Sequence, residues 1–294
     1  MGRPEFFLYL PQMRMPVDAV CERASAAERS GFTGIAFMDH LAPPLAEDTP
    51  MYEAMTLATW VAARTTDLVV SHLVLCDAFR HPTVLAKQAV TLDHASGGRF
   101  ELALGWGSIA HELESYGVTD DGAPERVARL SESLTIVRAL WAGGPVVHHG
   151  AHFDVDCAGQ QPTPLGSIPV VVGGTGPRTL GLVREHADWW NVPIYGLDRL
   201  EELRPAAGAA RVSTQHLVAF VPRGADREAT LALADRRFGG MSGGPLAGNA
   251  DELVAAFTPL HERGVDRFYV WFADFAPPTT LEAFGDEVIR VMAG

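Results

Sequence analysis

Residues 170–180 have the sequence Val170-Val171-Val172-Gly173-Gly174-Thr175-Gly176-Pro177-Arg178-Thr179-Leu180. The apolar, β-branched run is typical of a buried strand, and the proline stands where a helix would begin. Free backbone N–H groups and the dipole at such a helix N-terminus favour a bound anion, and an arginine adds a permanent positive charge. The segment therefore predicts a phosphate site formed by Gly173, Gly174, Thr175, Gly176 and Arg178.

A pattern of one strand followed by one helix extends from this segment toward both ends of the sequence. We expect strands at residues 6–10, 34–38, 68–75, 100–104, 168–172, 189–192, 215–221 and 267–272. We expect helices at residues 17–30, 52–64, 82–92, 124–141, 178–186, 197–204, 251–263 and 281–292. Short, continuously apolar strands indicate a parallel sheet buried on both faces. Eight units predict an α/β fold, a (β/α)8 TIM barrel, with a doubly wound open sheet as the alternative.

Two longer segments interrupt the alternation. Residues 143–166 predict a short insertion, a hairpin, before the fifth strand, and the glycine-rich residues 238–249 predict a mobile loop. The composition shows no linker, so residues 1–294 are expected to form one domain. In a barrel, functional side chains belong to the loops that follow the C-terminal ends of the strands.

Composition excludes several classes of protein. The 294 residues carry 36 acidic and 23 basic side chains, a net charge of −13, which argues against a nucleic-acid partner but not against a small anion. Three widely spaced cysteines fit neither a disulfide framework nor a zinc site. Residues 1–5 lack the layout of a signal peptide, and no apolar run approaches the ~18 residues of a membrane helix. A cytoplasmic protein without membrane contact is expected.

The end of the second strand carries Asp39 and His40. Histidine titrates near neutral pH, and an adjacent carboxylate can fix its tautomer, so the pair suits acid/base chemistry. The alternative is a histidine that is merely hydrogen-bonded at the barrel rim.

The third strand ends at Cys76, followed by Asp77 and Arg80. No nearby base activates the cysteine, so a small packed thiol is favoured over a nucleophile. Asp77 and Arg80 are expected to form a loop ion pair.

The fourth strand ends in Gly105-Trp106-Gly107-Ser108. Glycines let backbone approach a ligand and Trp106 can form a pocket wall, although an ordinary tight turn explains the glycines equally well. A partly apolar pocket would include Trp106, with Phe79, Met13 and Met38. No metal spacing connects the polar residues that follow strand four or those of the insertion: His111, Glu112, Glu114, His148, His149 and His152.

The strand ends together resemble the bacterial luciferase-like monooxygenase superfamily, which includes F420-dependent oxidoreductases. The matching segments are residues 37–40 (Phe-Met-Asp-His), 75–82, 92–107 with Ser-Gly-Gly-Arg, 172–180 with Gly-Gly-x-Gly-x-Arg, and 187–191. They follow one another in the expected order over nearly the whole chain. No dinucleotide-binding, Walker or nucleophile-elbow motif competes with this resemblance.

The resemblance implies a (β/α)8 barrel and a set of cofactor-binding residues. Residues 173–176 and Arg178 would hold the cofactor phosphate, Gly105 and Gly107 would line its ribityl chain, and Trp106 would lie beside it. A non-proline cis peptide of the family, which bulges against the isoalloxazine ring, would fall at or next to Cys76-Asp77, so these two residues would also bind the cofactor. Some F420-dependent members have a glutamate in the loop after the fourth strand, where Trp106 and Ser108 stand here.

Asp39-His40 resembles the F420-dependent version of the family, in which His40 would exchange a proton and Asp39 would touch the deazaflavin or orient the histidine. The first hypothesis is therefore an F420-dependent oxidoreductase that moves a hydride to or from a small organic substrate. The second is a monooxygenase that uses reduced FMN and oxygen. The third is a flavin- or phosphate-binding barrel without redox chemistry. A homodimer is compatible with each of them.

Overall fold

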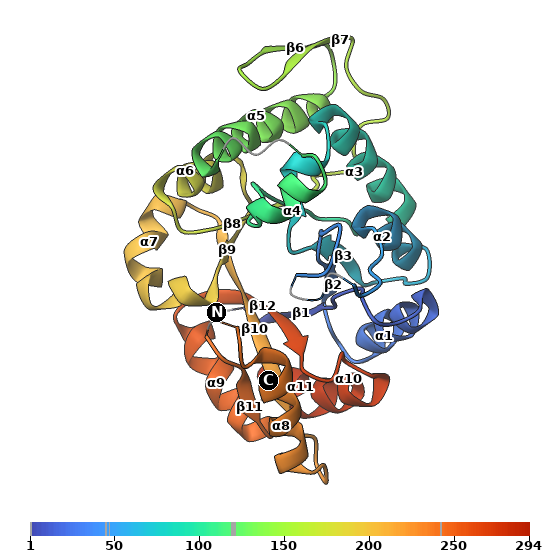
Figure 1. Ribbon diagram of the computed structural model, residues 1–294, viewed down its shortest axis with the longest axis vertical. Coiled ribbons are helices and arrows are strands. Elements are labelled where there is room, and N and C mark those ends of the chain that lie inside the picture. The colour runs from blue at the N-terminus through green and yellow to red at the C-terminus, as the bar shows by residue number, and fades with distance from the viewer. Residues whose placement is uncertain (1, 45, 47, 119–121, 242) are drawn as a thin grey trace.

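Parallel strands form a ring that helices surround in the computed structural model, which describes residues 2–44, 46, 48–118, 122–241 and 243–294 (Figure 1). The strands of the ring are β1 (Glu5–Tyr9), β2 (Gly34–Phe37), β3 (Val69–His72), β4 (Leu75–Cys76), β5 (Leu102–Gly105), β8 (Val170–Gly173), β9 (Trp189–Val192), β10 (Arg211–Phe220) and β12 (Val265–Phe272). The helices around it are α1 (Val17–Arg29), α2 (Ala54–Ala62), α3 (Pro82–Ser96), α4 (Ala110–Ser115), α5 (Ala123–Ala142), α6 (Pro177–His186), α7 (Leu200–Ala207), α8 (Arg227–Phe238), α9 (Ala250–Glu262), α10 (Pro278–Phe284) and α11 (Arg290–Met292).

The order of the strands closes the ring. Hydrogen bonds connect them as β3-β2-β1-β12-β10-β9-β8-β5-β4, and every pair on this path is parallel. β3 and β4 are two parts of one run of chain, so the two ends of the path meet, and a parallel bridge joins Val70 to Phe100. The (β/α)8 barrel is confirmed, and the open sheet is wrong.

Side chains alternate between the two faces of each strand. In β8, Val170 and Val172 pack outward in the main core against the helices, whereas Val171 packs inside the barrel with Trp189. Arg267 is buried near the N-terminal ends of the strands, where Glu101 and Glu5 each lie 2.7 Å from its guanidinium. This ion-paired cluster fills the N-terminal end of the barrel.

The insertion before the fifth barrel strand is confirmed as a hairpin of β6 (Val146–His149) and β7 (Asp154–Cys157). The mobile loop expected at residues 238–249 is wrong in part. β11 (Leu246–Gly248) pairs with β10 there, although Ser242 lies outside the described residues.

Two further elements differ from expectation, and both differences concern the pattern of buried residues. α8 was not predicted because only Ala234 and Phe238 of this helix are buried, so its apolar stripe is narrow. β10 begins four residues before the expected strand, and this early part contains two polar residues that are buried, Ser213 and Thr214. Thr214 donates a hydrogen bond to the Val192 carbonyl at 3.0 Å, and Asn191 donates one to Ser213 at 3.2 Å.

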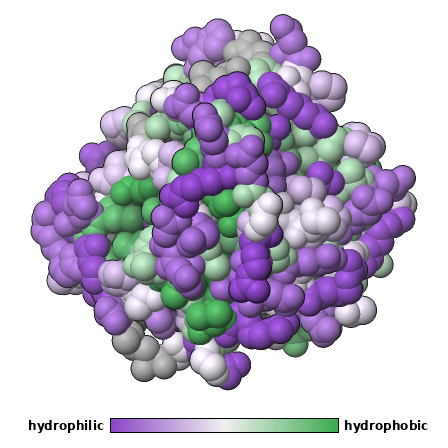
Figure 2. Space-filling view, turned by 90° about the horizontal axis from the view of Figure 1, so that it is seen from below, coloured by the Kyte–Doolittle hydropathy of each residue, from purple (hydrophilic) through white to green (hydrophobic). Residues whose placement is uncertain are grey.

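Seen from below, hydrophilic residues cover most of the surface and apolar ones emerge in patches (Figure 2). No helix within the described ranges is long and apolar enough to cross a membrane.

Candidate active site

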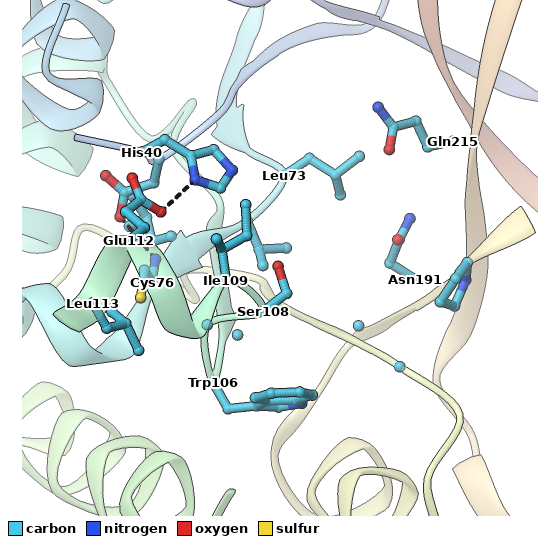
Figure 3. A pocket seen from close by; sticks show the side chains of 18 of the residues that line it. His40, Leu73, Cys76, Trp106, Ser108, Ile109, Glu112, Leu113, Asn191 and Gln215 are labelled. Carbon is cyan, nitrogen blue, oxygen red and sulfur yellow. Dashed lines mark hydrogen bonds and ion pairs between the residues drawn. The ribbon is translucent and has the colours of Figure 1, made fainter. Parts of the chain in front are cut away.

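A cavity of about 260 Å³ opens at the C-terminal ends of the barrel strands (Figure 3). Its walls come from the ends of the second to the seventh barrel strands and the loops after them. The residues around it are Asp39, His40, Leu73, Val74, Leu75, Cys76, Gly105, Trp106, Gly107, Ser108, Ile109, Glu112, Leu113, Gly173, Gly174, Asn191, Pro193, Tyr195 and Gln215. The barrel therefore brings together eight of the twelve predicted site residues. It leaves Asp77, Thr175, Gly176 and Arg178 outside the cavity lining.

His40 is paired with Glu112, a residue that the sequence did not single out as its partner. The Nδ1 atom of His40 lies 2.7 Å from Oε2 of Glu112, and the Glu112 Oε1 atom accepts the backbone N–H of Leu41 at 2.6 Å. Burial by itself would raise the pKa of Glu112, but the hydrogen bonds from His40 and the backbone lower it. An ionised Glu112 holds the hydrogen on Nδ1 and leaves Nε2 for a ligand. Figure 3 shows Asn191 and Gln215 across the cavity from this ring.

Trp106 and Ser108 stand in the loop after the fourth strand, as the sequence indicates, and a glutamate from beyond that loop reaches His40 instead. Glu112 comes from α4, the short helix that begins a few residues further along the same loop. The signal in the sequence that could have identified Glu112 is its position, a carboxylate directly after a strand-end loop. The sequence around Glu112 has no metal-ligand spacing, and one carboxylate is enough to orient a histidine.

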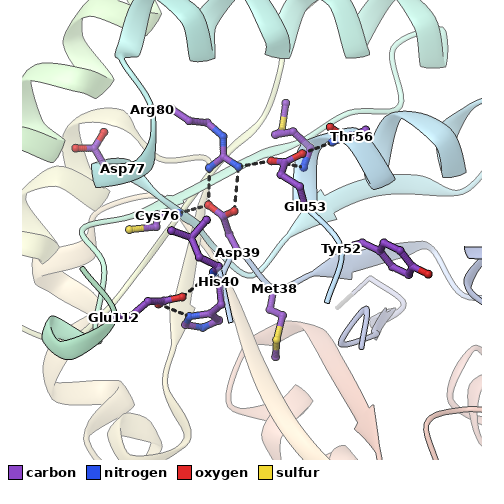
Figure 4. A network of polar contacts seen from close by, with 12 residues as sticks. Met38, Asp39, His40, Tyr52, Glu53, Thr56, Cys76, Asp77, Arg80 and Glu112 are labelled. Carbon is purple, nitrogen blue, oxygen red and sulfur yellow. Dashed lines mark hydrogen bonds and ion pairs between the residues drawn. The ribbon is translucent and has the colours of Figure 1, made fainter. Parts of the chain in front are cut away.

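Asp39 does not orient His40. Its two carboxylate oxygens accept hydrogen bonds from the Arg80 guanidinium at 2.5 and 2.9 Å, and one of them also accepts the Cys76 N–H at 2.7 Å (Figure 4). Arg80 also donates a hydrogen bond to the Glu53 carboxylate at 2.6 Å, and Glu53 caps the N-terminus of α2. Asp39 is thus a buried carboxylate that ties the end of the second strand to the end of the third.

The predicted ion pair of Asp77 with Arg80 is wrong. Figure 4 shows the Asp77 carboxyl group turned away from Arg80, and its nearest charged partner is the Arg129 Nε atom at 3.1 Å. Burial raises the pKa of Asp77. Asp77 therefore helps to attach the loop to α5, and it does not face the cavity.

Cys76 is buried, and burial raises the pKa of its thiol to about 12. A thiol that stays protonated at neutral pH is a poor nucleophile, in agreement with the packed thiol. The non-proline cis peptide lies at Leu73–Val74, between β3 and β4, and not at Cys76-Asp77. Both residues of that bond line the cavity.

The loop after the fourth barrel strand forms one wall. Gly107 has a φ of +80°, and a Cβ atom there would lie 2.9 Å from the Cys76 Sγ atom, so glycine is required. The guanidinium of Arg126 stands over the Trp106 ring, 4.9 Å from its centroid. Phe79, expected in the pocket, lines neither this cavity nor the neighbouring one.

The predicted phosphate turn begins in the lining of the cavity and continues beyond it. Gly173 and Gly174 line it, and α6 begins at Pro177 without a side-chain cap on its first N–H groups. Arg178 is exposed, and in the part of the chain that the structure describes it makes no hydrogen bond or ion pair. The turn thus offers backbone donors and one unpaired guanidinium to an anion that extends out of the cavity.

The histidines of the insertion contact carboxylates singly. His148 lies 3.1 Å from Glu132, and His149 lies 2.7 Å from Asp154. Among the described residues, no group of three or more His, Cys, Asp or Glu side chains could hold a metal ion.

A second cavity of about 510 Å³ adjoins the first, and the two share His40 and Gln215. Met13 and Met38, expected in an apolar pocket, line this second cavity. Gln215 and Asn191 were not predicted as site residues. Gln215 points inward near the middle of a buried strand, a position that the alternation of β10 identifies once its start at Arg211 is known.

The closed (β/α)8 barrel and the histidine–glutamate pair at its C-terminal face place this chain in a class of barrel enzymes. In these enzymes the active site lies at the C-terminal ends of the strands. The sequence profile of the family described as luciferase-like monooxygenase matches residues 5–221, and the chain belongs to this family. The resemblance seen in the strand-end motifs is confirmed.

Two relatives carry F420-dependent names. The F420-dependent glucose-6-phosphate dehydrogenase of Microbacterium testaceum is 30% identical over 269 residues, which cover 83% of this chain and 77% of the relative. The F420-dependent hydroxymycolic acid dehydrogenase of Mycobacterium tuberculosis is 31% identical over 198 residues, which cover 67% of this chain and 54% of the relative. Among solved structures, an F420-dependent secondary alcohol dehydrogenase in complex with an F420-acetone adduct superposes with a TM-score of 0.84 at 18% identity, over 99% of both chains.

Proposed function

We propose that this protein is an F420-dependent oxidoreductase that transfers a hydride between the deazaflavin coenzyme and a small organic substrate, a carbinol or its carbonyl product. The observation that carries the proposal is His40, oriented by Glu112 at 2.7 Å and exposed to both cavities. The F420-dependent names of the relatives support the choice of coenzyme.

The residues present fit a deazaflavin cofactor. The first cavity offers apolar surface from Val74, Leu75 and Ile109 for a planar ring, and amide groups from Asn191 and Gln215 for its polar edge. The glycines at 105, 107, 173 and 174 leave room for a polyol chain to pass close to the backbone. The turn before α6, with Arg178, would hold the phosphate.

F420, when bound, supplies a two-electron hydride acceptor or donor. The chain supplies the proton transfer. With Glu112 holding the hydrogen on Nδ1, the Nε2 atom of His40 takes the proton that the substrate hydroxyl loses as its carbinol carbon becomes a carbonyl. In the reverse direction, the same Nε2–H donates a proton to the carbonyl oxygen. Glu112 stabilises the positive charge that His40 carries after it accepts the proton.

Titration of the purified protein with F420 and with FMN tests the cofactor. We expect saturable binding of F420, and a change in the fluorescence of the deazaflavin as it enters the cavity reports this binding. Tight binding of FMN without binding of F420 would instead support the monooxygenase that uses reduced FMN and oxygen. Failure to bind either would support a barrel without redox chemistry.

Variants separate the two proposed roles. His40→Asn should reduce turnover by about 10²–10⁴-fold, the range of a lost general acid or base, while F420 affinity changes little. Arg178→Ala should weaken F420 binding by about 10-fold or more, since a charge-assisted hydrogen bond contributes roughly 1.5–3 kcal/mol. Unchanged turnover in the first variant would remove His40 from the chemistry.

Three broader expectations belong to the same proposal. We propose that residues 1–294 act as one domain, that the protein works in the cytoplasm, and that it forms a homodimer. Light scattering after gel filtration measures the oligomeric state, cell fractionation measures the location, and a single cooperative unfolding transition is expected of one domain.

A further inference from the structure

We propose that the second cavity binds a substrate that has an apolar body and carries an anionic group, a carboxylate or a phosphate, at the end away from His40. The inference rests on the proposed function, because it names the class of substrate that the barrel presents to His40. The observations that carry it are the apolar walls of the cavity and three arginines at its mouth.

The position of the second cavity fits a substrate. It has a volume of about 510 Å³ and shares His40 and Gln215 with the first cavity. A molecule in the second cavity therefore meets the proton-transferring ring at one end, beside the space assigned to the cofactor. The cavity reaches from that point to the loops around α8.

The walls of this cavity are aromatic and thioether side chains. Trp271 stands between Tyr9 and Phe238, with ring centroids 5.4 Å away on each side. Met38 lines the cavity near the barrel interior, and Met241 lines it near the end of α8. Thioethers and rings adapt to an apolar body and offer it few hydrogen bonds, so they select against a fully polar substrate such as a free sugar.

Arg14, Arg236 and Arg237 line the same cavity, in a protein of net charge −13. Arg237 donates a hydrogen bond to the Ala273 carbonyl and stands over the Phe275 ring, 4.4 Å from its centroid. Within the described part of the chain, Arg14 and Arg236 have no hydrogen-bonding or ion-pair partner for their guanidinium groups. The cavity lining contains no Asp or Glu among the described residues.

The charges that act on Arg237 are those of Asp274 and of the two neighbouring arginines. Burial lowers the pKa of Arg237, and the like charges of Arg14 and Arg236 act in the same direction, so the three groups interact electrostatically. Asp274 opposes this effect, but its carboxylate accepts hydrogen bonds from the Thr280 hydroxyl at 2.6 Å and the Ala276 N–H at 3.0 Å. An anion of the ligand would complete the cluster.

Backbone conformation marks the same cavity. Among the described non-glycine residues, positive φ occurs at Arg14 (59°), Phe275 (61°) and Ala276 (52°). The first two line the cavity. Such backbone costs free energy and is enriched at ligand sites, where the surrounding structure holds it.

Matched dye binding tests the inference without turnover. The probes are 1-anilinonaphthalene-8-sulfonate and N-phenyl-1-naphthylamine, which share an apolar body and differ by the sulfonate, measured with F420 present in excess to fill the first cavity. We expect the sulfonate to bind about 10-fold tighter, and the Arg14→Gln/Arg236→Gln variant to lose that preference while it binds the neutral dye as before. Arg3→Gln/Arg199→Gln, at exposed arginines outside the cavity, is the control and should keep it.

Turnover of matched alcohols identifies the anion. The substrates are 4-phenyl-2-butanol, 4-(3-hydroxybutyl)benzoic acid and 4-(3-hydroxybutyl)phenyl phosphate. We expect KM about 10-fold lower for one of the anionic alcohols than for the neutral one, and a loss of that difference in Arg14→Gln/Arg236→Gln. The better of the two anions distinguishes a carboxylate from a phosphate.

The failures of the two proposals are distinguishable. F420 binding and turnover with no preference for an anion, in wild type or variant, would overturn the inference and leave the proposed function intact. Absence of F420 binding would overturn the proposed function. The two dyes would then still test whether the second cavity binds an apolar anion. Equal affinity for the two dyes would contradict that inference.

Discussion

The Nδ1 atom of His40 and the Oε2 atom of Glu112 lie 2.7 Å apart, although 72 positions separate the two residues in the chain. The first follows the second barrel strand, and the second lies on a short helix after the fourth. Parallel closure of the barrel places both loops on one face. The hydrogen bond fixes which nitrogen of the ring is open to the cavity, and with it the role of the histidine.

Glu112→Gln should lower kcat by about 10²-fold, the lower part of the range for a general acid–base unit, and leave F420 affinity unchanged. The neutral amide cannot stabilise a protonated His40 as the carboxylate does. Steady-state kinetics beside a cofactor titration measure the two effects. Glu114→Gln changes an exposed residue of the same helix and should behave as wild type. An equal loss in both variants would show that the helix, rather than the carboxylate, is responsible.

Arg80→Met should lower the free energy of unfolding by about 3–5 kcal/mol, because it leaves the buried Asp39 carboxylate without its cation. Denaturant titration measures the change. Arg199→Met, which removes an exposed arginine paired with Glu202, is the control and should change stability little. Comparable losses in both variants would contradict the structural role assigned to Arg80.

Glu53, which also pairs with Arg80, makes the free energy of unfolding depend on pH. Burial opposes ionisation, but hydrogen bonds from the start of α2 and from Arg80 lower the Glu53 pKa to about 2. Since the folded pKa lies below the unfolded value, the contribution of Glu53 is complete above about pH 4.5 and is lost as pH falls toward 2. We expect the stability difference between wild type and Glu53→Gln to shrink over that window. A difference independent of pH would contradict the ionised contact.

Two glycines of the site should respond differently to a side chain. Gly107→Ala places a Cβ atom 2.9 Å from Cys76 Sγ at a φ of +80°, and should cost about 1–2 kcal/mol of stability. Gly173 has ordinary φ, and its nearest neighbour to a Cβ atom is 3.6 Å away, so Gly173→Ala should fold with near-normal stability. Its added side chain faces the proposed cofactor space and should weaken F420 binding. Thermal unfolding and cofactor titration together separate the two outcomes.

His216 should make the protein less stable in mild acid. It packs outside the barrel against Phe257 and Phe268, and neither ring nitrogen has a hydrogen-bond partner among the described residues. Burial lowers its pKa to about 4. The unfolded chain therefore binds a proton that the folded chain excludes, so stability falls as pH drops from about 6.5 to about 4, by about 3 kcal/mol from this group.

His216→Phe should remove that part of the pH dependence and match or exceed wild type at pH 5. Urea titrations at pH 5 and 7 measure the effect. His149→Gln changes an exposed histidine of the insertion and should leave the slope as it is. A slope that persists in His216→Phe would assign the acid sensitivity to other groups, His72 first among them.

The sequence alone determined the barrel and the location of the site. Short apolar strands alternating with helices allow only a few parallel architectures, and glycine and polar residues recurred at the strand ends. For the same reason the histidine and the two glycine-rich strand ends were identified correctly as parts of one face. Local patterns sufficed because each depends on residues adjacent in the chain.

Only the tertiary structure decided which partners these residues have. Asp39 neighbours His40 in sequence, but successive residues at a strand end point in different directions, so Asp39 meets Arg80 while His40 meets Glu112. Asp77 likewise turns from Arg80 toward Arg129. The arginines of the second cavity come from residue 14 and from α8, more than two hundred residues apart, and only closure of the barrel brings them to one cavity. Side-chain pairing across loops depends on this three-dimensional closure, which no local pattern contains.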